Sequence, residues 1–352
     1  MKTTKIQLRF HPDGSFRILM ISDFHGGKNF SPLLVRGIDA LLEHTHPDLV
    51  LLGGDQCGAT SPDDLYTYLS AVLEPIHRRG LPWAHVYGNH DRESGMSNRE
   101  QQQVYERFPL CLSEGGPDDV YGCGNYVLPI LSADGSRVAY NIFALDSNRE
   151  ISDYIEHFGL SAEEGKQTVL PDCFGYGSCQ ASPMFSQVKW YFDTSSDMER
   201  ENGQKIPAIL YMHVPIPEYI LCARNPEETA FNGAKREEIC CGELNSGLFS
   251  ACLERGDVSG IFCGHEHYCN FDAEYCGITL AYDGAVGYDM SAHDDLRGGR
   301  IIDLYDDGRM KTHHVRLMEL LGIKAMRNPA FFEGGDKYAV RCQMKHKGGS
   351  IF

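Results

Sequence analysis

The stretch FRILMISDFH, residues 16–25, joins a run of apolar side chains to an Asp-x-His pair. Residues 16–21 are apolar almost without interruption, which is typical of a strand buried on both faces of a sheet. Asp23 and His25 then lie just past the carboxyl end of that strand. Because open α/β sheets bind ligands at the carboxyl ends of their strands, we expect these two side chains to belong to a site.

The same arrangement recurs twice further along the chain. Residues 48–52 (DLVLL) form a second apolar run, which ends at Gly53-Gly54-Asp55. Residues 83–87 form a third run, which ends at Gly88-Asn89-His90-Asp91. Three predicted strands therefore deliver polar, ligand-type side chains to their carboxyl ends.

Helical patterns separate these strands. One begins at Ser31-Pro32 and continues with leucines at helical spacing, and another begins at Ser61, with Ser61 as N-cap and Pro62 at the first helical position. This alternation of strand and helix predicts parallel pairing with right-handed crossovers. The carboxyl ends of the strands then share one edge of a sheet.

The second half of the chain is richer in strands. Predicted strands cover residues 138–145, 206–212, 258–263, 278–282, 300–304 and 311–317, and predicted helices cover residues 183–194 and 246–254. Two groups of strands with flanking helices predict two packed sheets with helices outside, an α/β fold. We assign residues 1–317 to one domain and residues 318–352, where the pattern weakens, to a C-terminal extension of uncertain structure.

Composition restricts the class of protein. A chain of 352 residues with 42% hydrophobic content can bury a substantial core as one domain. A net charge of −17 disfavours nucleic-acid and anionic-lipid partners, and no apolar run is long enough to span a membrane. Residues 1–10 lack the apolar core of a signal peptide, and the cysteine count of thirteen is odd. We expect a cytoplasmic protein with buried thiols; a secreted chain whose signal has been removed is the alternative.

Three more histidines complete a set of side chains that could bind two metal ions. His213 follows the predicted strand 206–212, and His265 and His267 follow strand 258–263. Two ions that share a carboxylate need a bridging Asp, further oxygen donors and several imidazoles. Asp55, after two glycines that permit a tight turn, is our choice for the bridge.

The other ligands divide between the two ions. Asp23 and His25 suit one ion, Asn89 offers a carbonyl oxygen to the other, and the three later histidines complete both shells. Such a mixture of nitrogen and oxygen donors favours manganese, iron, zinc or cobalt over calcium or magnesium. A set of ligands for two metal ions that share a carboxylate predicts hydrolysis rather than binding alone.

These residues resemble the calcineurin-like metallophosphoesterase pattern D-x-H, G-D, G-N-H-[DE], H, G-H-x-H. The resemblance implies a four-layer αββα sandwich of two mixed β-sheets, with residues 1–317 as the catalytic domain. It implies two ligand sets that share Asp55. The first set is Asp23, His25, Asp55 and His267, and the second is Asp55, Asn89, His213 and His265. His90 would then not bind metal but would protonate the leaving oxygen or stabilise charge.

The chain looks most similar to a branch labelled purple-acid-phosphatase-like, which includes plant proteins and a fungal cell-cycle regulator. The stretches that carry this likeness include residues 8–26, 212–218, 245–247 and 282–300. Purple acid phosphatases owe their colour to a tyrosine three positions after the bridging Asp, where this chain has Gly58. The resemblance therefore implies a centre that is not purple.

Gly58 also stands where the serine/threonine protein phosphatases have an Asp that orients their catalytic His. Asp91 is our other candidate catalytic residue, and it could pair with His90 or with Arg92. Arg92, Arg149, Arg224 and Arg236 could hold a phosphate oxygen, with a surface ion pair as the alternative for each. Asp146 and Ser147 either line the crevice or form an ordinary turn.

We therefore expect hydrolysis of a phosphomonoester or phosphodiester by a metal-bound hydroxide. The substrate would be a small phosphorylated molecule or a phosphoprotein, recognised by loops that we expect at residues 94–107, 150–183 and 218–238. One alternative is a catalytically silent phosphate-binding or scaffold protein with the same fold. Another is a nuclease, which the net charge disfavours.

Overall fold

The computed structural model describes residues 6–27, 29–56, 58–150, 157–159, 180–242, 244–290 and 292–322. One of its two mixed sheets has five strands, and their order across the sheet is β12 (Met310–Arg316), β11 (Gly298–Tyr305), β2 (Ser15–Ile21), β3 (Leu49–Leu52) and β4 (Trp83–His85). The neighbours β2, β3 and β4 pair in parallel, whereas β11 is antiparallel to both β2 and β12. The three strands predicted first therefore end at one common edge.

The second sheet has seven strands. Their order is β1 (Leu8–Arg9), β5 (Tyr126–Leu131), β6 (Val138–Ala144), β7 (Ala208–Tyr211), β8 (Val258–Cys263), β10 (Ile278–Tyr282) and β9 (Asp272–Tyr275). The central strands β6, β7, β8 and β10 are parallel. This sheet therefore also collects the carboxyl ends of several strands at one edge.

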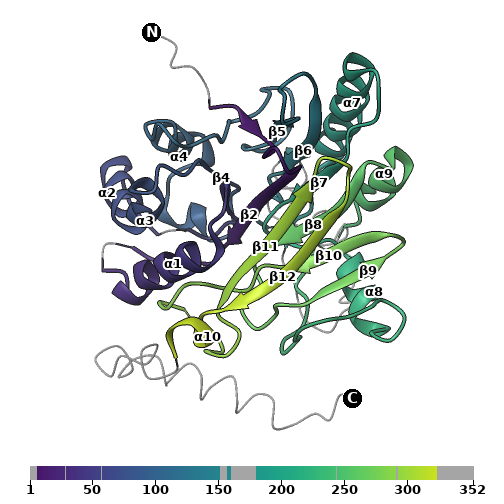
Figure 1. The fold of residues 1–352 in the computed structure, drawn as a ribbon. Helices are drawn as coiled ribbons and strands as arrows, with labels where there is room; N and C mark the ends of the chain where they lie inside the picture. The colour runs from purple at the N-terminus through teal and green to yellow at the C-terminus, as the bar shows by residue number, and fades with distance from the viewer. Residues whose placement is uncertain are drawn as a thin grey trace.

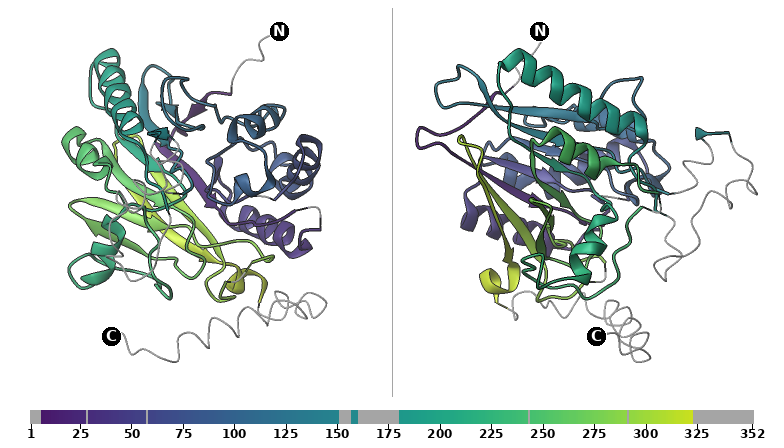
Figure 2. Two further views of the ribbon diagram at one scale, coloured as in Figure 1. Left: turned by 180° about the vertical axis from the view of Figure 1, so that it is seen from behind. Right: turned by 90° about the vertical axis from the view of Figure 1, so that its right-hand side faces the viewer.

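Helices cover the outer face of each sheet. Those on the five-stranded sheet are α1 (Pro32–Thr45), α2 (Pro62–Val72), α3 (Glu74–His77), α4 (Asn98–Tyr105) and α10 (Leu317–Leu321). Those on the seven-stranded sheet are α7 (Phe185–Asn202), α8 (Glu218–Arg224) and α9 (Leu248–Arg255). Figures 1 and 2 show these two groups of helices on opposite flanks of the molecule, with the sheets between them.

The alternation of side chains along the strands explains the four layers. In β2, Leu19 and Ile21 pack against the helices, whereas Ile18 and Met20 pack between the two sheets. Successive side chains of a strand point to opposite faces, so a strand that is apolar on both faces must be covered on both. The predicted αββα sandwich is confirmed.

Predicted and observed elements agree best where the apolar pattern is strong. The helices that were predicted from Ser31-Pro32 and Ser61-Pro62 are α1 and α2, and each has its serine as N-cap. The strands β1, β5 and β9 were not predicted. β1 is short, β5 contains Pro129 and β9 is half polar.

Segments 94–107 and 218–238, which were expected to be loops, contain the helices α4 and α8. The polar sequence of α4 hides its buried face, on which Val104 and Tyr105 lie. Segment 150–183 lies mostly outside the described residues, and so does the part of the predicted C-terminal extension from residue 323 onward.

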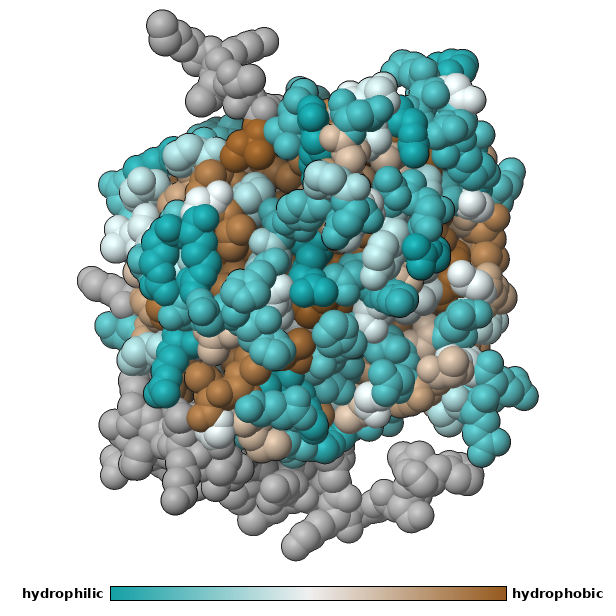
Figure 3. All heavy atoms as spheres, viewed as in Figure 1, coloured by the Kyte–Doolittle hydropathy of each residue, from teal (hydrophilic) through white to brown (hydrophobic). Residues whose placement is uncertain are grey.

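Hydrophilic side chains cover most of the face seen in Figure 3, with hydrophobic residues scattered among them. Within the described residues no helix is long and apolar enough to cross a membrane. Each cysteine that the structure describes is a free thiol, and most of these thiols are buried.

Candidate metal centre

Two groups of side chains that could hold a metal ion lie at the carboxyl ends of the strands. The first group is Asp23, His25 and His267, and the second is Asp55, His213 and His265. Within each group, the ligand atoms all lie within 4.8 Å of one another. These are six of the seven metal ligands predicted from the sequence, and the structure divides them as the resemblance implies.

In the first group, the histidines surround one carboxylate oxygen. Asp23 Oδ1 lies 3.3 Å from His267 Nε2 and 3.6 Å from His25 Nε2. The two imidazole nitrogens are 3.1 Å apart. All three atoms therefore face a common point.

Asp55 connects the two groups. Its Oδ2 atom lies 3.2 Å from His213 Nε2 in the second group and 3.4 Å from His25 Nε2 in the first. Asn89, the seventh predicted ligand, places its Oδ1 atom 3.2 Å from His213 Nε2. The position of Asp55 is the one that a bridging carboxylate needs.

The backbone at these ligands is unusual. Eight described residues other than glycine have a positive φ, and four of them are candidate ligands: Asp23 (57°), His25 (46°), Asp55 (53°) and His265 (79°). A non-glycine residue seldom adopts this left-handed conformation, which costs free energy and persists at functional sites. Here it turns each side chain inward from a strand end.

Glycines allow the loops to approach one another closely. A Cβ atom on Gly88 would lie 2.1 Å from Asp55 Oδ1, and one on Gly54 would lie 2.4 Å from His213 Nδ1. Gly54 also has a φ of +101°, which favours glycine. The glycines of the Gly-Asp and Gly-Asn-His-Asp motifs therefore make room for the ligands.

Charges at the site favour a cation. Burial alone would raise the pKa of Asp23, but the nearby His25 and His267 imidazoles hold that pKa well below its usual range. Burial would likewise raise the pKa of Asp55, and the charge of His213 lowers it. Both residues are therefore carboxylates at neutral pH.

One oxygen of each carboxylate is buried without a hydrogen bond among the described residues, namely Asp23 Oδ1 and Asp55 Oδ2. Buried charged oxygens without a partner are costly. Metal ions would supply the missing partners, and a mixture of carboxylate, amide and imidazole donors suits transition metals. The residues present therefore fit a dinuclear centre.

Further side chains hold Asp23 in place. Its Oδ2 atom accepts a hydrogen bond from the backbone N–H of His265 at 3.1 Å and another from the hydroxyl of Ser22. The same hydroxyl hydrogen-bonds Asp283 Oδ1 at 2.7 Å. Asp283 follows β10 and is fully buried. It lies in the stretch 282–300 that carries the family likeness, but the sequence predicted no role for it.

His90 lies at the mouth of the site. Its ring centroid is 5.2 Å from that of His25, and its side chain is 46% exposed, so a substrate could reach it. His90 Nδ1 donates to Glu93 Oε1 at 2.7 Å. Glu93 thus orients the imidazole. From the sequence, Asp91 was the candidate for this function.

Asp91 is fully buried and has a different set of contacts. Its Oδ2 atom accepts hydrogen bonds from the backbone N–H groups of Gly88, at 2.8 Å, and Asp55, at 3.0 Å. It therefore joins the loop after β3 to the loop after β4. These contacts favour a positioning role for Asp91 over contact with a substrate.

The four arginines considered as phosphate ligands lie in different places. Arg92 and Arg149 line a pocket beside Gly88, together with Asp146. Arg236 forms a two-pronged ion pair with Asp295, and Arg224 lies at the end of α8. Ser147 Oγ accepts a hydrogen bond from Val214 N at 3.0 Å, so it supports the loop of His213.

Comparison with known proteins places the chain in a family. The family model described as calcineurin-like phosphoesterase matches residues 16–269, which span every candidate ligand. The chain belongs to the calcineurin-like phosphoesterase family. The resemblance noted from the D-x-H, G-D, G-N-H-D and G-H-x-H motifs is thereby confirmed.

Relatives within the calcineurin-like phosphoesterases include plant and fungal proteins. The chain is 31% identical to "Probable inactive purple acid phosphatase 14" of Arabidopsis thaliana over 315 residues, which cover 80% of this chain and 73% of the relative. It is 27% identical to "Phosphatase DCR2" of Saccharomyces cerevisiae over 288 residues, covering 75% and 45% respectively. Both matches agree with the branch predicted from the sequence.

A solved structure shares the fold. A dimetal phosphatase from Danio rerio aligns with a TM-score of 0.55 and 15% identity, over 84% of this chain and 95% of that protein. At this identity the match supports the architecture of two mixed sheets with flanking helices.

Proposed function

We propose that this chain is a phosphoesterase that uses two metal ions to hydrolyse a phosphomonoester or phosphodiester. One observation supports this most directly: the buried oxygens Asp23 Oδ1 and Asp55 Oδ2 have no hydrogen bond within the described part of the chain, and they face histidine nitrogens within 3.2 to 3.6 Å. We propose manganese, iron, zinc or cobalt as the metal.

Two bound ions would lower the pKa of a water molecule and offset the charge that develops on the phosphoryl oxygens. The protein supplies the position of each donor. Asp55 lies between the two ligand groups, and Asp23, His25 and His267 form one side of the site. Asn89, His213 and His265 form the other side.

His90 provides the proton for the leaving oxygen. Because Glu93 accepts the Nδ1 hydrogen, Nε2 is the ring nitrogen that remains for proton transfer. The exposed side chain of His90 lies next to His25, at the rim of the ligand groups. We propose a small phosphorylated molecule or a phosphoprotein as substrate.

The test combines metal analysis with an assay of phosphoester turnover. We expect the purified protein to retain transition metal and to hydrolyse an aryl phosphate when manganese is added. Asp55→Asn removes the central charge and should remove most of the metal, whereas His90→Ala should keep the metal and lower kcat by about 10²- to 10⁴-fold. Asp63→Asn, at a 97% exposed carboxylate on α2, is the matched control. Absence of metal, or full activity in both site variants, would contradict the proposal.

A catalytically silent protein is the second candidate, because the plant relatives carry the words "Probable inactive" in their names. Such a protein would keep its metal and bind phosphate but turn over no ester. A panel of monoesters and diesters, run with several divalent metals, separates this candidate from the enzyme.

We also propose a cytoplasmic location, based on the odd number of cysteines and the free thiols among the described residues. Fractionation of cells that express the tagged chain tests it.

A further inference from the structure

A pocket with three arginines lies beside the candidate metal centre. It has a cavity volume of about 180 Å³, whereas a cavity of roughly 10–15 Å³ already holds one water molecule. The residues that line it are Gly88, Arg92, Ser97, Asn98, Arg99, Tyr121, Gly122, Cys123, Asp146, Asn148 and Arg149. The pocket is therefore large enough for a phosphate group and part of a carbon chain.

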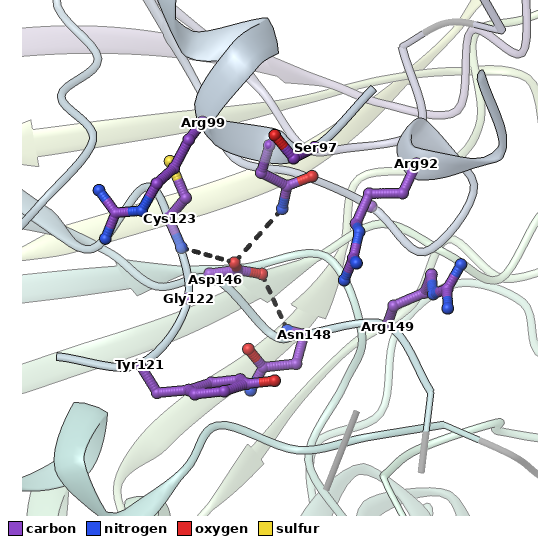
Figure 4. Close-up of a pocket in the computed structure, with 11 residues that line it drawn as sticks. Arg92, Ser97, Arg99, Tyr121, Gly122, Cys123, Asp146, Asn148 and Arg149 are labelled. Atoms are coloured by element: carbon purple, nitrogen blue, oxygen red, sulfur yellow. Dashed lines mark hydrogen bonds between the residues drawn. The ribbon is translucent and has the colours of Figure 1, made fainter. Parts of the chain in front are cut away.

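The three arginines come from three separate segments. Arg92 lies in the short 3-10 helix η1 (Asp91–Ser94), Arg99 lies in the first turn of α4, and Arg149 lies in the loop after β6. Figure 4 shows Arg92 and Arg149 on one side of Asp146 and Arg99 on the other. The fold thus gathers two cations from neighbouring helices and a third from a loop further along the chain around one hollow.

The acidic groups near the pocket do not outnumber these cations. Asp146 is the single carboxylate among the described residues that line the pocket, and it accepts hydrogen bonds from Cys123 N and Asn148 N at 2.9 Å and from Asn98 Nδ2 at 3.4 Å. Arg99 contacts Asp118, whose side chain is 96% exposed, and Arg149 lies 3.8 Å from Glu150. Among the described residues that line the pocket, guanidinium groups outnumber carboxylates by three to one, in a chain with a net charge of −17.

Gly88 connects the pocket to the metal ligands. Gly88 lines the pocket, and a Cβ atom on it would lie 2.1 Å from Asp55 Oδ1. Arg92 follows the candidate proton donor His90 by two residues. On the other side, Ser147 lies between two lining residues and hydrogen-bonds the loop of His213 through Val214. The pocket therefore borders the loops that carry Asp55 and His213.

We propose that this pocket binds a second phosphate group on the substrate, so that the protein prefers small bisphosphorylated molecules over monophosphates. The proposal rests on the proposed phosphoesterase function, which places the first phosphate at the metal ions. Arginine suits this role because its planar guanidinium can donate two parallel hydrogen bonds to phosphate oxygens. Arg149 is the residue to change, since it is 27% exposed and lies outside the loops that carry the metal ligands.

The test compares alkanediol bisphosphates of two to six carbons with the matching monophosphates, using the manganese-loaded protein. For at least one chain length, we expect kcat/KM to be higher for the bisphosphate by about tenfold or more, mainly through KM. Arg149→Gln should abolish most of this preference. Arg137→Gln, at an arginine that lines a separate hollow, should keep it.

A binding measurement separates failure of this proposal from failure of the proposed function. Calorimetry with non-hydrolysable alkane bisphosphonates and monophosphonates needs no turnover. Tighter binding of a bisphosphonate that Arg149→Gln weakens and Arg137→Gln does not would support the pocket, even if no ester is hydrolysed. Equal binding of the two ligand types at every length, or a preference that persists in Arg149→Gln, would overturn it.

Discussion

At the scale of single residues, the candidate ligands combine strain with burial. Asp23, His25, Asp55 and His265 hold left-handed backbone conformations, each of which costs on the order of 1–3 kcal/mol for a non-glycine residue. Hydrogen bonds between the loops stabilise them, such as Asp23 N to Gly54 O and His25 N to Asp55 O, both at 3.0 Å. The ligands are therefore oriented before any ion binds.

Glu93 is predicted to matter for turnover and not for metal binding. Glu93→Gln replaces the carboxylate that accepts from His90 Nδ1 by a neutral and weaker amide acceptor, so the imidazole is oriented less firmly. We expect kcat to fall by about threefold to tenfold, a modest effect because both side chains are partly exposed. KM and metal content should stay unchanged. Glu254→Gln, at an exposed carboxylate on α9, is the control, and an equal loss in both variants would point to a general effect on charge.

Metal binding by His213 should depend on pH. Burial alone would lower the pKa of His213, but the charge of Asp55 outweighs burial and raises the pKa to about 10. The metal-free site then holds a proton on His213 at neutral pH, and an ion must displace it. Metal affinity should therefore rise about tenfold per pH unit from pH 6 toward pH 10. Calorimetric titrations in two buffers measure the released proton. An affinity that stays flat between pH 6 and 8 would refute the assignment.

At the scale of secondary-structure elements, the motifs work because they follow parallel strands. The ends of β2, β3 and β4 in one sheet face the ends of β7 and β8 in the other, so five short loops supply all seven candidate ligands. The apolar runs predicted these strands well, since a doubly covered strand has a distinctive composition. The positions of α4 and η1, which carry two of the pocket arginines, were not predicted, because their sequences are polar and short.

Asp91 should couple the loop after β3 to the loop after β4. Asp91→Ala leaves the buried N–H groups of Asp55 and Gly88 without this acceptor, which should lower the free energy of unfolding by about 2–5 kcal/mol. The metal affinity should fall with it, because both loops carry ligands. Asp91→Asn keeps one oxygen acceptor and should lose distinctly less stability and metal affinity. Urea titration and metal analysis of the two variants test this, and equal losses would contradict the hydrogen-bond explanation.

At the scale of the whole molecule, Arg300 links the two sheets. It lies in β11 of the five-stranded sheet and is fully buried. Its guanidinium donates to Asp272 Oδ1 in β9 at 2.9 Å and to the carbonyl oxygen of Asn270 at 2.7 Å, and it also hydrogen-bonds the carbonyl of Tyr282. The sheets are therefore held together by polar contacts as well as by their shared core.

Removal of Arg300 should destabilise the fold without removing a candidate metal ligand. Arg300→Met breaks a buried ion pair and leaves carbonyl oxygens unpaired, which should lower the free energy of unfolding by about 3–5 kcal/mol. Arg316→Met removes an exposed arginine that pairs with Glu319 and should change the free energy of unfolding by less than about 1 kcal/mol. Thermal unfolding of both variants measures the difference. Similar melting temperatures would show that Arg300 does not hold the sheets together.

By itself the sequence determined the strands with long apolar runs, the two serine-capped helices and the seven ligand types, because apolar runs, caps and spacing are local properties. It could not identify Glu93, Asp283 or Arg99, since each acts through contacts that form only when separate loops meet. Tertiary structure alone decided that Asp55 lies within 3.2 to 3.4 Å of histidines from two different sheets. It also decided that Arg92, Arg99 and Arg149 line one pocket. Packing of the two sheets brings these groups together, and no local pattern encodes that distance.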